Sequence, residues 1–527
     1  MSTCKKPRRI ISNDDGWILS EYEPPVTDLD LKARMIDTYK NTQVGALLWC
    51  VGSPIVCSYE TEVGEVYGEG FTRFDSDAER WRVENIRHLI ETQGGPLTAL
   101  TKLCHESSMD IFPSVRMNSH YATDVSGPSY GRIRRDHPEL LIGRPGEILA
   151  DGSLEWGIRT GLDYSHPEVR NHVAAMVEEL IEKFNVNGVE LDYMRHPAFF
   201  RVDEAYENRH YMTQMLRDIR RRMLEIGQTK GRDLELAVRV PPTLEDSARI
   251  GLDVKTWMAD GLVDIVTVGG GFIPFEAKTE EFVEASKSND CLVYGCIEHL
   301  RPAVDEQVIR AIATRFWNAG VAGIHLFNYF GKTAEWKRRI LDQIADPTAL
   351  SRLDKRYHMD NTDRITIRDL HDYSFRYAVP EVQLPIILPY NLSMRGIVLN
   401  LRIDDDIETA NAEGAIAQCI LNLKLDYYRG EDELEIWLNG DLLSSGSSKV
   451  SFVPWTRLEW TEFPTRLAEV SHDGGIIEFS LEYPSLRQGD NDLEVRLIKR
   501  TVTQPNPIVI RDVEVIILYR YPQSMPD

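Results

Sequence analysis

Two acidic residues, Glu190 and Asp192, stand two positions apart in the stretch 187–197, which reads Asn-Gly-Val-Glu-Leu-Asp-Tyr-Met-Arg-His-Pro. Apolar residues alternate with them and Pro197 follows, a pattern typical of a short buried strand that ends at the proline. Successive side chains of a strand face opposite ways, so the two carboxylates share one face. Because carboxylates are rarely buried without a reason, the pair is a candidate for acid–base chemistry. The alternative is packing alone, with Arg195 or another arginine as ion partner.

The elements around this stretch alternate between strand and helix. A helix with apolar residues at helical spacing precedes it over 169–184, and further helical patterns separate the other strand-like runs. Eight such runs occur before residue 348, at 8–12, 44–49, 111–116, 187–197, 234–240, 263–268, 292–299 and 323–329. This order predicts an α/β fold, a (β/α)8 barrel over 1–347. A doubly wound open sheet is the alternative, but no glycine-rich dinucleotide turn follows the first strand.

The pattern changes after Pro347. A polar connection over 348–362 leads to short alternating runs across 363–527, including 365–368, 396–403, 421–428, 433–438, 476–481, 492–498 and 508–518. Alternation with a period of two predicts strands with one buried face, and Asn439-Gly440 is typical of a tight hairpin turn. We therefore expect 363–527 to form an all-β sandwich domain joined to the barrel by 348–362.

The carboxyl ends of the barrel strands should bring several polar side chains to one mouth. Glu298 ends the seventh strand, so it should face Asp192 across this mouth. Two facing carboxylates are what glycosidic cleavage requires, one to protonate the leaving oxygen and one to attack or to activate water. Asp14 or Asp15, after the first strand, is the next candidate should Glu298 face outward, although either could instead cap the following segment.

Further side chains at the same strand ends are expected to bind substrate or to tune the carboxylates. Arginines bind carboxylates and sulfates through two parallel hydrogen bonds, so arginines at the mouth of an acidic protein suggest an acidic sugar. The alternative is that they pair internally with the acidic residues. The expected set comprises Asp14, Trp49, Arg116, Asn118, His120, Glu190, Arg195, His196, Arg239 and Asn328.

The run from Gly188 to Arg195 resembles the fourth-strand motif of glycoside hydrolases with a barrel fold. The pattern Trp257-x-x-x-Gly261-Leu-Val-Asp264 is similar to the glycosyl-hydrolase-like barrel proteins of bacteria. The resemblance implies a glycosidase that needs no cofactor and acts on a carbohydrate. The sandwich resembles the jelly-roll modules of carbohydrate enzymes in one short run, 435–440.

The stretch can be aligned with the fourth-strand motifs of three types of glycosidase, and each alignment implies different roles for the residues around Asp192. In chitinase-type enzymes the motif ends in the catalytic acid, and Met194 stands at that position here. The α-glycosidase register implies that Asp192 is the nucleophile. The other large clan of barrel glycosidases implies that Asp192 is the acid and Glu298 the nucleophile. We expect Asp192→Asn to abolish turnover and to leave the melting temperature nearly unchanged.

Composition excludes several other classes of function. A net charge of −23 argues against nucleic acid or an anionic membrane as partner. No His-x-His follows the first strand and the seven cysteines lack metal-ligand spacing, so no metal is expected. The N-terminus offers no signal-peptide pattern, so we expect a cytoplasmic protein; a homo-oligomer stays open.

The alternatives to a hydrolase are a non-catalytic carbohydrate-binding barrel, which Met194 favours, and a lyase acting on a uronic-acid polymer.

Overall fold

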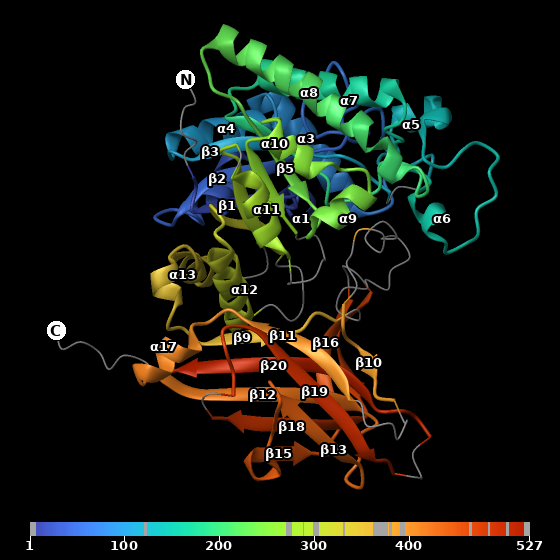
Figure 1. Cartoon of the computed structure of the whole chain (residues 1–527). Coiled ribbons are helices and arrows are strands. Elements are labelled where there is room, and N and C mark those ends of the chain that lie inside the picture. The colour runs from blue at the N-terminus through green and yellow to red at the C-terminus, as the bar shows by residue number, and fades with distance from the viewer. Residues whose placement is uncertain are drawn as a thin grey trace, which may run out of the picture.

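The computed structural model shows a barrel surrounded by helices, joined to a β-rich C-terminal part (Figure 1). It describes residues 7–120, 124–269, 277–287, 289–298, 305–329, 333–361, 378, 382–389, 396–462, 466–482, 485–501 and 505–520; for 457–462 and 466–467 it describes the backbone alone.

Eight parallel strands close into a barrel in the order of the sequence, which confirms the predicted fold class. Helices surround the barrel, so the outer faces of its strands are as apolar as a parallel sheet requires. The strands are β1 (Ile10–Asp14), β2 (Val44–Gly52), β3 (Asp110–Arg116), β4 (Gly188–Asp192), β5 (Glu235–Val240), β6 (Ile265–Val268), β7 (Leu292–Glu298) and β8 (Gly323–Phe327).

The connections between the strands differ greatly in length. Those after β2 and β3 are long, and those after β6 to β8 are short. The helices of the barrel are α1 (Ile18–Glu21), α2 (Asp28–Leu31), the π-helix η1 (Lys32–Asp37), α3 (Asp77–Gln93), α4 (Pro96–Glu106), α5 (Arg132–Asp136), the 3-10 helix η2 (Pro138–Leu140), α6 (Leu154–Ile158), α7 (Pro167–Lys183), α8 (Ala205–Lys230), α9 (Leu244–Arg249), α10 (Val254–Ala259), α11 (Thr279–Ser286), α12 (Glu306–Ala319), α13 (Ala334–Ile344) and α14 (Pro347–Leu350).

Several strand ends differ from the prediction, and two of these differences bear on the site. β1 runs to Asp14 rather than stopping at residue 12, and β4 stops at Asp192, before Pro197. The chain leaves β4 early because the Asp192 carboxylate accepts a hydrogen bond of 2.9 Å from the backbone N–H of Met194, which turns the backbone away from the sheet. The residues between Asp192 and Pro197 therefore form a loop at the barrel end.

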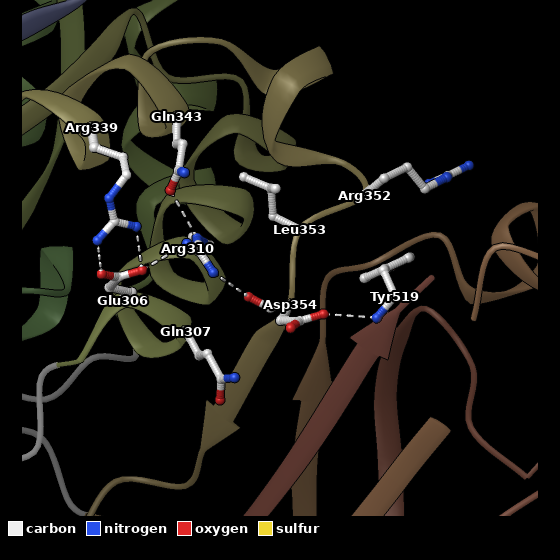
Figure 2. Close-up of a pocket in the computed structure, with 9 residues that line it drawn as sticks. All are labelled: Glu306, Gln307, Arg310, Arg339, Gln343, Arg352, Leu353, Asp354 and Tyr519. Atoms are coloured by element: carbon white, nitrogen blue, oxygen red, sulfur yellow. Dashed lines mark hydrogen bonds and ion pairs between the residues drawn. The ribbon is translucent and has the colours of Figure 1, made fainter. Parts of the chain in front are cut away.

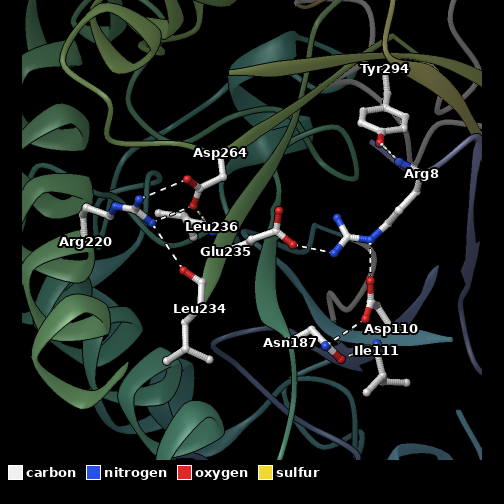
Figure 3. A network of polar contacts seen from close by, with 10 residues as sticks. All are labelled: Arg8, Asp110, Ile111, Asn187, Arg220, Leu234, Glu235, Leu236, Asp264 and Tyr294. Atoms are coloured by element: carbon white, nitrogen blue, oxygen red, sulfur yellow. Dashed lines mark hydrogen bonds and ion pairs between the residues drawn. The ribbon is translucent and has the colours of Figure 1, made fainter. Parts of the chain in front are cut away.

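An ion-pair network closes the amino-terminal end of the barrel (Figure 3). Arg8 donates from Nε to Asp110 at 2.7 Å and from Nη2 to Glu235 at 2.5 Å, and its backbone N–H donates to the Tyr294 hydroxyl at 2.9 Å. Above this network lies an apolar layer of inward-facing side chains: Ile11, Ala46, Leu48, Phe112, Ala237, Ile265 and Tyr294. The lower half of the barrel is therefore filled, as in other barrels of this size, and only the carboxyl end is left for chemistry.

The C-terminal part consists of antiparallel sheets, as predicted. Asn439 and Gly440 both have positive φ and join β13 to β14 in the predicted hairpin. The predicted run 365–368 lies outside the described residues. The elements are β9 (Lys355–His358), β10 (Ile386–Ile387), β11 (Ile397–Ile403), α17 (Ile407–Ala412), β12 (Ile416–Asp426), β13 (Glu433–Leu438), β14 (Asp441–Leu442), the 3-10 helix η3 (Ser445–Ser447), β15 (Ser448–Ser451), β16 (Trp455–Glu462), β17 (Arg466–His472), β18 (Gly474–Leu481), β19 (Gly489–Lys499) and β20 (Val509–Tyr519).

The stretch 348–362, expected to be a linker, contains β9, which pairs with β20 and so belongs to the C-terminal sheet. Helix α12 of the barrel lies against this sheet (Figure 1). Arg315 of α12 pairs with Asp404 at 2.8 Å, and both side chains are buried. Arg310 of the same helix donates to the Asp354 carbonyl at 3.3 Å, beside a pocket that Arg339, Arg352 and Tyr519 also line (Figure 2). The buried ion pair between Arg315 and Asp404 thus joins the barrel to the C-terminal part.

Candidate active site

The strand β4 presents both of its acidic residues to the barrel interior. Val189 and Leu191 pack in the outer core with the helices, so Glu190 and Asp192 face inward. The shared face predicted from the sequence is therefore the inner one. Both carboxylates are almost fully enclosed, and Asp192 is 1% exposed.

Asp192 is held by Arg239, which stands beside it at the end of β5. The guanidinium donates from Nε to Oδ1 at 2.9 Å and from Nη2 to Oδ2 at 2.8 Å, a two-point ion pair between buried side chains. Burial alone would lower the pKa of Arg239, but Asp192 outweighs it and raises that pKa above its ordinary value. The guanidinium also stacks 3.7 Å from the ring centroid of Phe327. Arg239 is thus a fixed cation that orients Asp192.

Glu298 ends β7 and is 4% exposed. It stands an even number of positions from Tyr294, which belongs to the inward-facing apolar layer, so Glu298 also faces inward. Its strand neighbour in β8 is Phe327, whose ring contacts Arg239. Asp14 or Asp15 would replace Glu298 as the second carboxylate only if Glu298 faced outward. Because Glu298 faces inward, this condition is not met.

The two aspartates that follow the first strand face different environments. Asp15 pairs with Arg116 and accepts a hydrogen bond of 2.6 Å from the Asn328 amide. Burial alone would raise the pKa of Asp15, but Arg116, Arg195 and these hydrogen bonds lower it to about 2. Asp15 is therefore an ionised member of the mouth, and Arg116 and Asn328 are engaged with it.

Asp14 points to the helix side of the barrel instead. Its charged neighbours are Arg34 of η1 and Lys337 of α13, and its carboxylate accepts a 2.8 Å hydrogen bond from the Gly16 N–H. Burial raises the pKa of Asp14 to about 7, against the lowering effect of Arg34. The substrate-binding role expected for Asp14 thus has no support from its position.

This buried carboxyl makes stability depend on pH in a direction opposite to the usual one for aspartate. Folded Asp14 binds a proton between pH 3.8 and about 7 where the unfolded chain does not, so its ionisation destabilises the fold progressively across this window. A difference of about three between the folded and unfolded pKa values corresponds to a loss of roughly 4 kcal/mol at most in the free energy of unfolding. We expect Asp14→Asn to gain stability over wild type in urea unfolding at about pH 7.5 and little at about pH 4.

Asp15→Asn should instead lose stability by a similar amount at both pH values, because the pKa of folded Asp15 is lowered to about 2 and its stabilising effect is lost only as the pH falls from about 4 to about 2. An Asp14→Asn variant whose stability difference from wild type is the same at both pH values would contradict the assignment.

Asn118, His120 and His196 fix the loops around the mouth rather than line it. The Asn118 amide donates to the carbonyls of Leu162 and Ala198 at 2.9 and 2.8 Å. The His120 and His196 rings meet edge to face at 5.3 Å, and the backbone N–H of His120 donates to His196 Nδ1 at 3.3 Å. Burial lowers the pKa of His120 to about 3 and that of His196 well below its ordinary value, so both rings are neutral near pH 7. The structure gives these three residues a positioning role.

Trp49 and Arg195, the remaining members of the expected substrate-binding set, are both buried but lie in different parts of the barrel. Trp49 is fully buried in the outer core, where its ring lies against the backbone of Gly16, and so has no exposed face for a sugar. Arg195 is buried near Asp15 and lowers the pKa of that carboxyl. Arg116 and Arg239 are bound to carboxylates, so these two arginines pair internally, which was the alternative to an acidic-sugar site.

Four inward-facing residues that the sequence-based selection left out of the site lie beneath these carboxylates: Ser114, Thr267, Cys296 and His325. Ser114 donates to Glu190 at 2.5 Å, and His325 lies 3.6 Å from the other oxygen of Glu190. Alternation along each strand was the signal that could have identified them, since each stands two positions from a residue already selected or from the apolar layer.

Among the described residues, no group of three or more histidine, cysteine, aspartate or glutamate side chains is arranged to hold a metal ion. Among the helices that the structure describes, none combines the length and the apolar character of a membrane-spanning segment.

No protein-family model matches the chain, and no curated protein matches its sequence. Solved structures with a similar arrangement include a chitinase from Paenibacillus sp., with 10% identity and a TM-score of 0.39 over 96% of this chain and 42% of that one. An α-amylase from Geobacillus thermoleovorans has 11% identity and a TM-score of 0.37 over 94% and 99%. A cycloisomaltooligosaccharide glucanotransferase from Paenibacillus sp. has 7% identity and a TM-score of 0.33 over 95% and 57%.

The chain thus spans about half the length of the chitinase and of the glucanotransferase. Glycoside hydrolases are among its structural neighbours, and the likeness is one of fold. TM-scores below 0.5 carry no inference about activity, so function has to be inferred from the site itself.

Proposed function

We propose that this chain is a glycoside hydrolase that cleaves O-glycosidic bonds of a poly- or oligosaccharide through Asp192 and Glu298. The observation that carries the proposal is the two-point ion pair that fixes Asp192 at the carboxyl end of β4. Glu298, inward-facing at the end of β7, supplies the second carboxyl group that the reaction requires.

The hydrogen bonds of Asp192 indicate which role each of the two carboxyl groups, Asp192 and Glu298, takes in the reaction. Oδ1 accepts from Arg239 Nε and from the Met194 N–H, whereas Oδ2 accepts from Arg239 Nη2. An ionised carboxylate has about four acceptor positions, so three are used and one remains on Oδ2. A proton on either oxygen would disturb the pair with Arg239. We therefore assign Asp192 as the ionised group whose Oδ2 attacks the anomeric carbon or activates water.

Glu298 then acts as the acid that protonates the leaving oxygen. Asp15, ionised between Arg116 and Asn328, keeps those side chains in fixed orientations beside the site. Because Arg116 and Arg239 are already paired with carboxylates, the charge balance favours an uncharged sugar over an acidic one, and does not favour a lyase on a uronic-acid polymer.

A panel of neutral and acidic polysaccharides, with matching oligosaccharides, tests the proposal. A hydrolase releases new reducing ends without ultraviolet absorption, whereas a lyase leaves an unsaturated sugar that absorbs. Reducing ends that appear with wild type and are absent with Asp192→Asn would support the proposal. An unsaturated product with any member of the panel would contradict it.

A non-catalytic carbohydrate-binding barrel is the second candidate, and one observation favours it: Asp192 and Glu298 are only 1% and 4% exposed. Titration calorimetry with the same panel separates the two functions. Binding without any product, unchanged by Asp192→Asn, would favour the binding protein.

A further inference from the structure

A polar layer lies inside the barrel directly beneath Asp192. Its members are Asn13, Ser114, Glu190, Thr267, Cys296 and His325, all buried. The interior of such a barrel is usually filled by branched apolar side chains, as it is one layer lower in this chain. Burying a glutamate and a histidine here costs free energy unless they are satisfied, so their presence needs an explanation.

The contacts in this layer lead from Cys296 through His325 to Glu190. Burial raises the pKa of the Cys296 thiol, which therefore stays protonated and donates to His325 Nδ1 at 3.4 Å. We assign the imidazole proton to Nε2, which lies 3.6 Å from Glu190 Oε1. Ser114 donates to the other carboxylate oxygen at 2.5 Å. Glu190 thus accepts a hydrogen bond from Ser114 on one oxygen and has the His325 ring at ion-pair distance from the other.

The Glu190 side chain lies next to the ion pair that orients Asp192. Glu190 and Asp192 face inward from the same strand; on β5, Arg239 is the partner of Asp192 and Ala237 is the partner of Glu190. Two nitrogens of Arg239 bind Asp192, and the charge of Glu190 further raises the pKa of the guanidinium. Two carboxylates therefore act on the charge of Arg239: Asp192, which it binds directly, and Glu190, which lies beneath it.

Five buried polar atoms of this region have no hydrogen-bond partner in the described part of the chain: Asn13 Oδ1, Glu190 Oε1, Arg239 Nη1, Thr267 Oγ1 and His325 Nε2. They come from five strands of one closed barrel and include both donors and acceptors. Buried polar groups in folded proteins are paired with protein or with ordered water. A mixed set of this kind, facing a common interior, suits water molecules that each make two to four hydrogen bonds.

We propose that Glu190 is a positioning residue, which acts with ordered water in the polar layer to fix Arg239 and thereby to keep Asp192 in its reactive orientation. This inference rests on the proposed glycosidase function for its effect on rate, but not for its effect on structure. Glu190 itself does not touch the substrate.

Glu190→Gln tests the kinetic part, since it keeps the size of the side chain and removes the charge. We expect kcat to fall about 10- to 100-fold with KM changed less than about 3-fold, because the variant disturbs the orientation of a reacting group rather than binding. Thr267→Val, which removes one hydroxyl at nearly constant volume, should lower kcat less. Glu235→Gln, at the closed end of the barrel, is the matched control and should leave kcat unchanged (Figure 3).

High-resolution crystal structures of wild type and Glu190→Gln test the structural part without any substrate. The wild type should show ordered water bonded to at least two of the five atoms, and the variant should lose the two-point contact between Arg239 and Asp192. A dry interior, or an unchanged contact together with an unchanged kcat, would overturn the proposal. Should wild type hydrolyse nothing, the glycosidase proposal fails while the structures still decide the role of Glu190. Should Glu190→Gln not fold, wild type and Thr267→Val decide the water part.

Discussion

Asp192→Asn is expected to reduce turnover about 10³-fold or more and to lower the free energy of unfolding by about 3–5 kcal/mol. The first effect follows because the amide can neither attack nor activate water. The second follows because the substitution leaves the Arg239 guanidinium buried beside a neutral partner, and breaking one side of a buried ion pair has a cost of this size. Initial rates and urea unfolding at one pH measure both.

This expectation replaces the nearly unchanged melting temperature that the sequence alone suggested. A double variant, Asp192→Asn with Arg239→Met, separates the two effects, since removing both charges should recover much of the stability and none of the activity. Full activity in Asp192→Asn would end the assignment. An unchanged free energy of unfolding in the single variant would contradict the ion pair.

Glu298→Gln is expected to lower the rate about 10²- to 10⁴-fold on substrates whose leaving group is a sugar, the range typical of general acid catalysis. The loss should be much smaller on nitrophenyl glycosides of the same sugar, because a nitrophenolate leaves without a proton. The ratio of the two rate losses therefore reports the role of Glu298 directly. Initial rates on a matched pair of substrates measure it.

Glu235→Gln is the control for this experiment as well, because it removes a glutamate from an ion pair at the opposite end of the barrel. It should lower stability without changing the ratio between the two substrates. Equal losses on both substrates in Glu298→Gln would assign Glu298 to another role, with Asp15 the next inward-facing carboxylate to examine.

Periodicity along the chain was enough to predict the barrel and the orientation of β4. The alternation around Glu190 and Asp192 placed both carboxylates on one face, which the structure shows to be the inner one. In the C-terminal part, Asn439 and Gly440 marked a hairpin through their local turn preference. These features depend on neighbours in sequence, so the sequence contains them.

The environment of each side chain was harder to predict, since it depends on contacts between strands distant in sequence. The first strand begins and ends two residues later than predicted, which turns Asp14 outward and Asp15 inward. Trp49 stands at a strand end but faces the helices, and so packs in the core. The pairing of Arg239 with Asp192 follows from the register between β4 and β5, which sequence does not specify.

The loop residues illustrate the same limit. Asn118 binds the backbone at 162 and 198, and His120 contacts His196, across loops of the barrel end. Polar residues just after a strand were reasonable candidates for substrate binding. Only the folded loops show that the Asn118 amide is already bonded to the backbone and that the two histidine rings pack against each other.

The most direct test is a crystal structure of Glu298→Gln with a bound oligosaccharide taken from the substrate screen. The proposed mechanism predicts the anomeric carbon about 3–3.5 Å from Asp192 Oδ2. It also predicts the glycosidic oxygen about 2.6–3.2 Å from the side chain at position 298. A sugar bound elsewhere on the chain, with Asp192 still enclosed by Arg239 and out of its reach, would contradict the assignment of the barrel mouth as the active site.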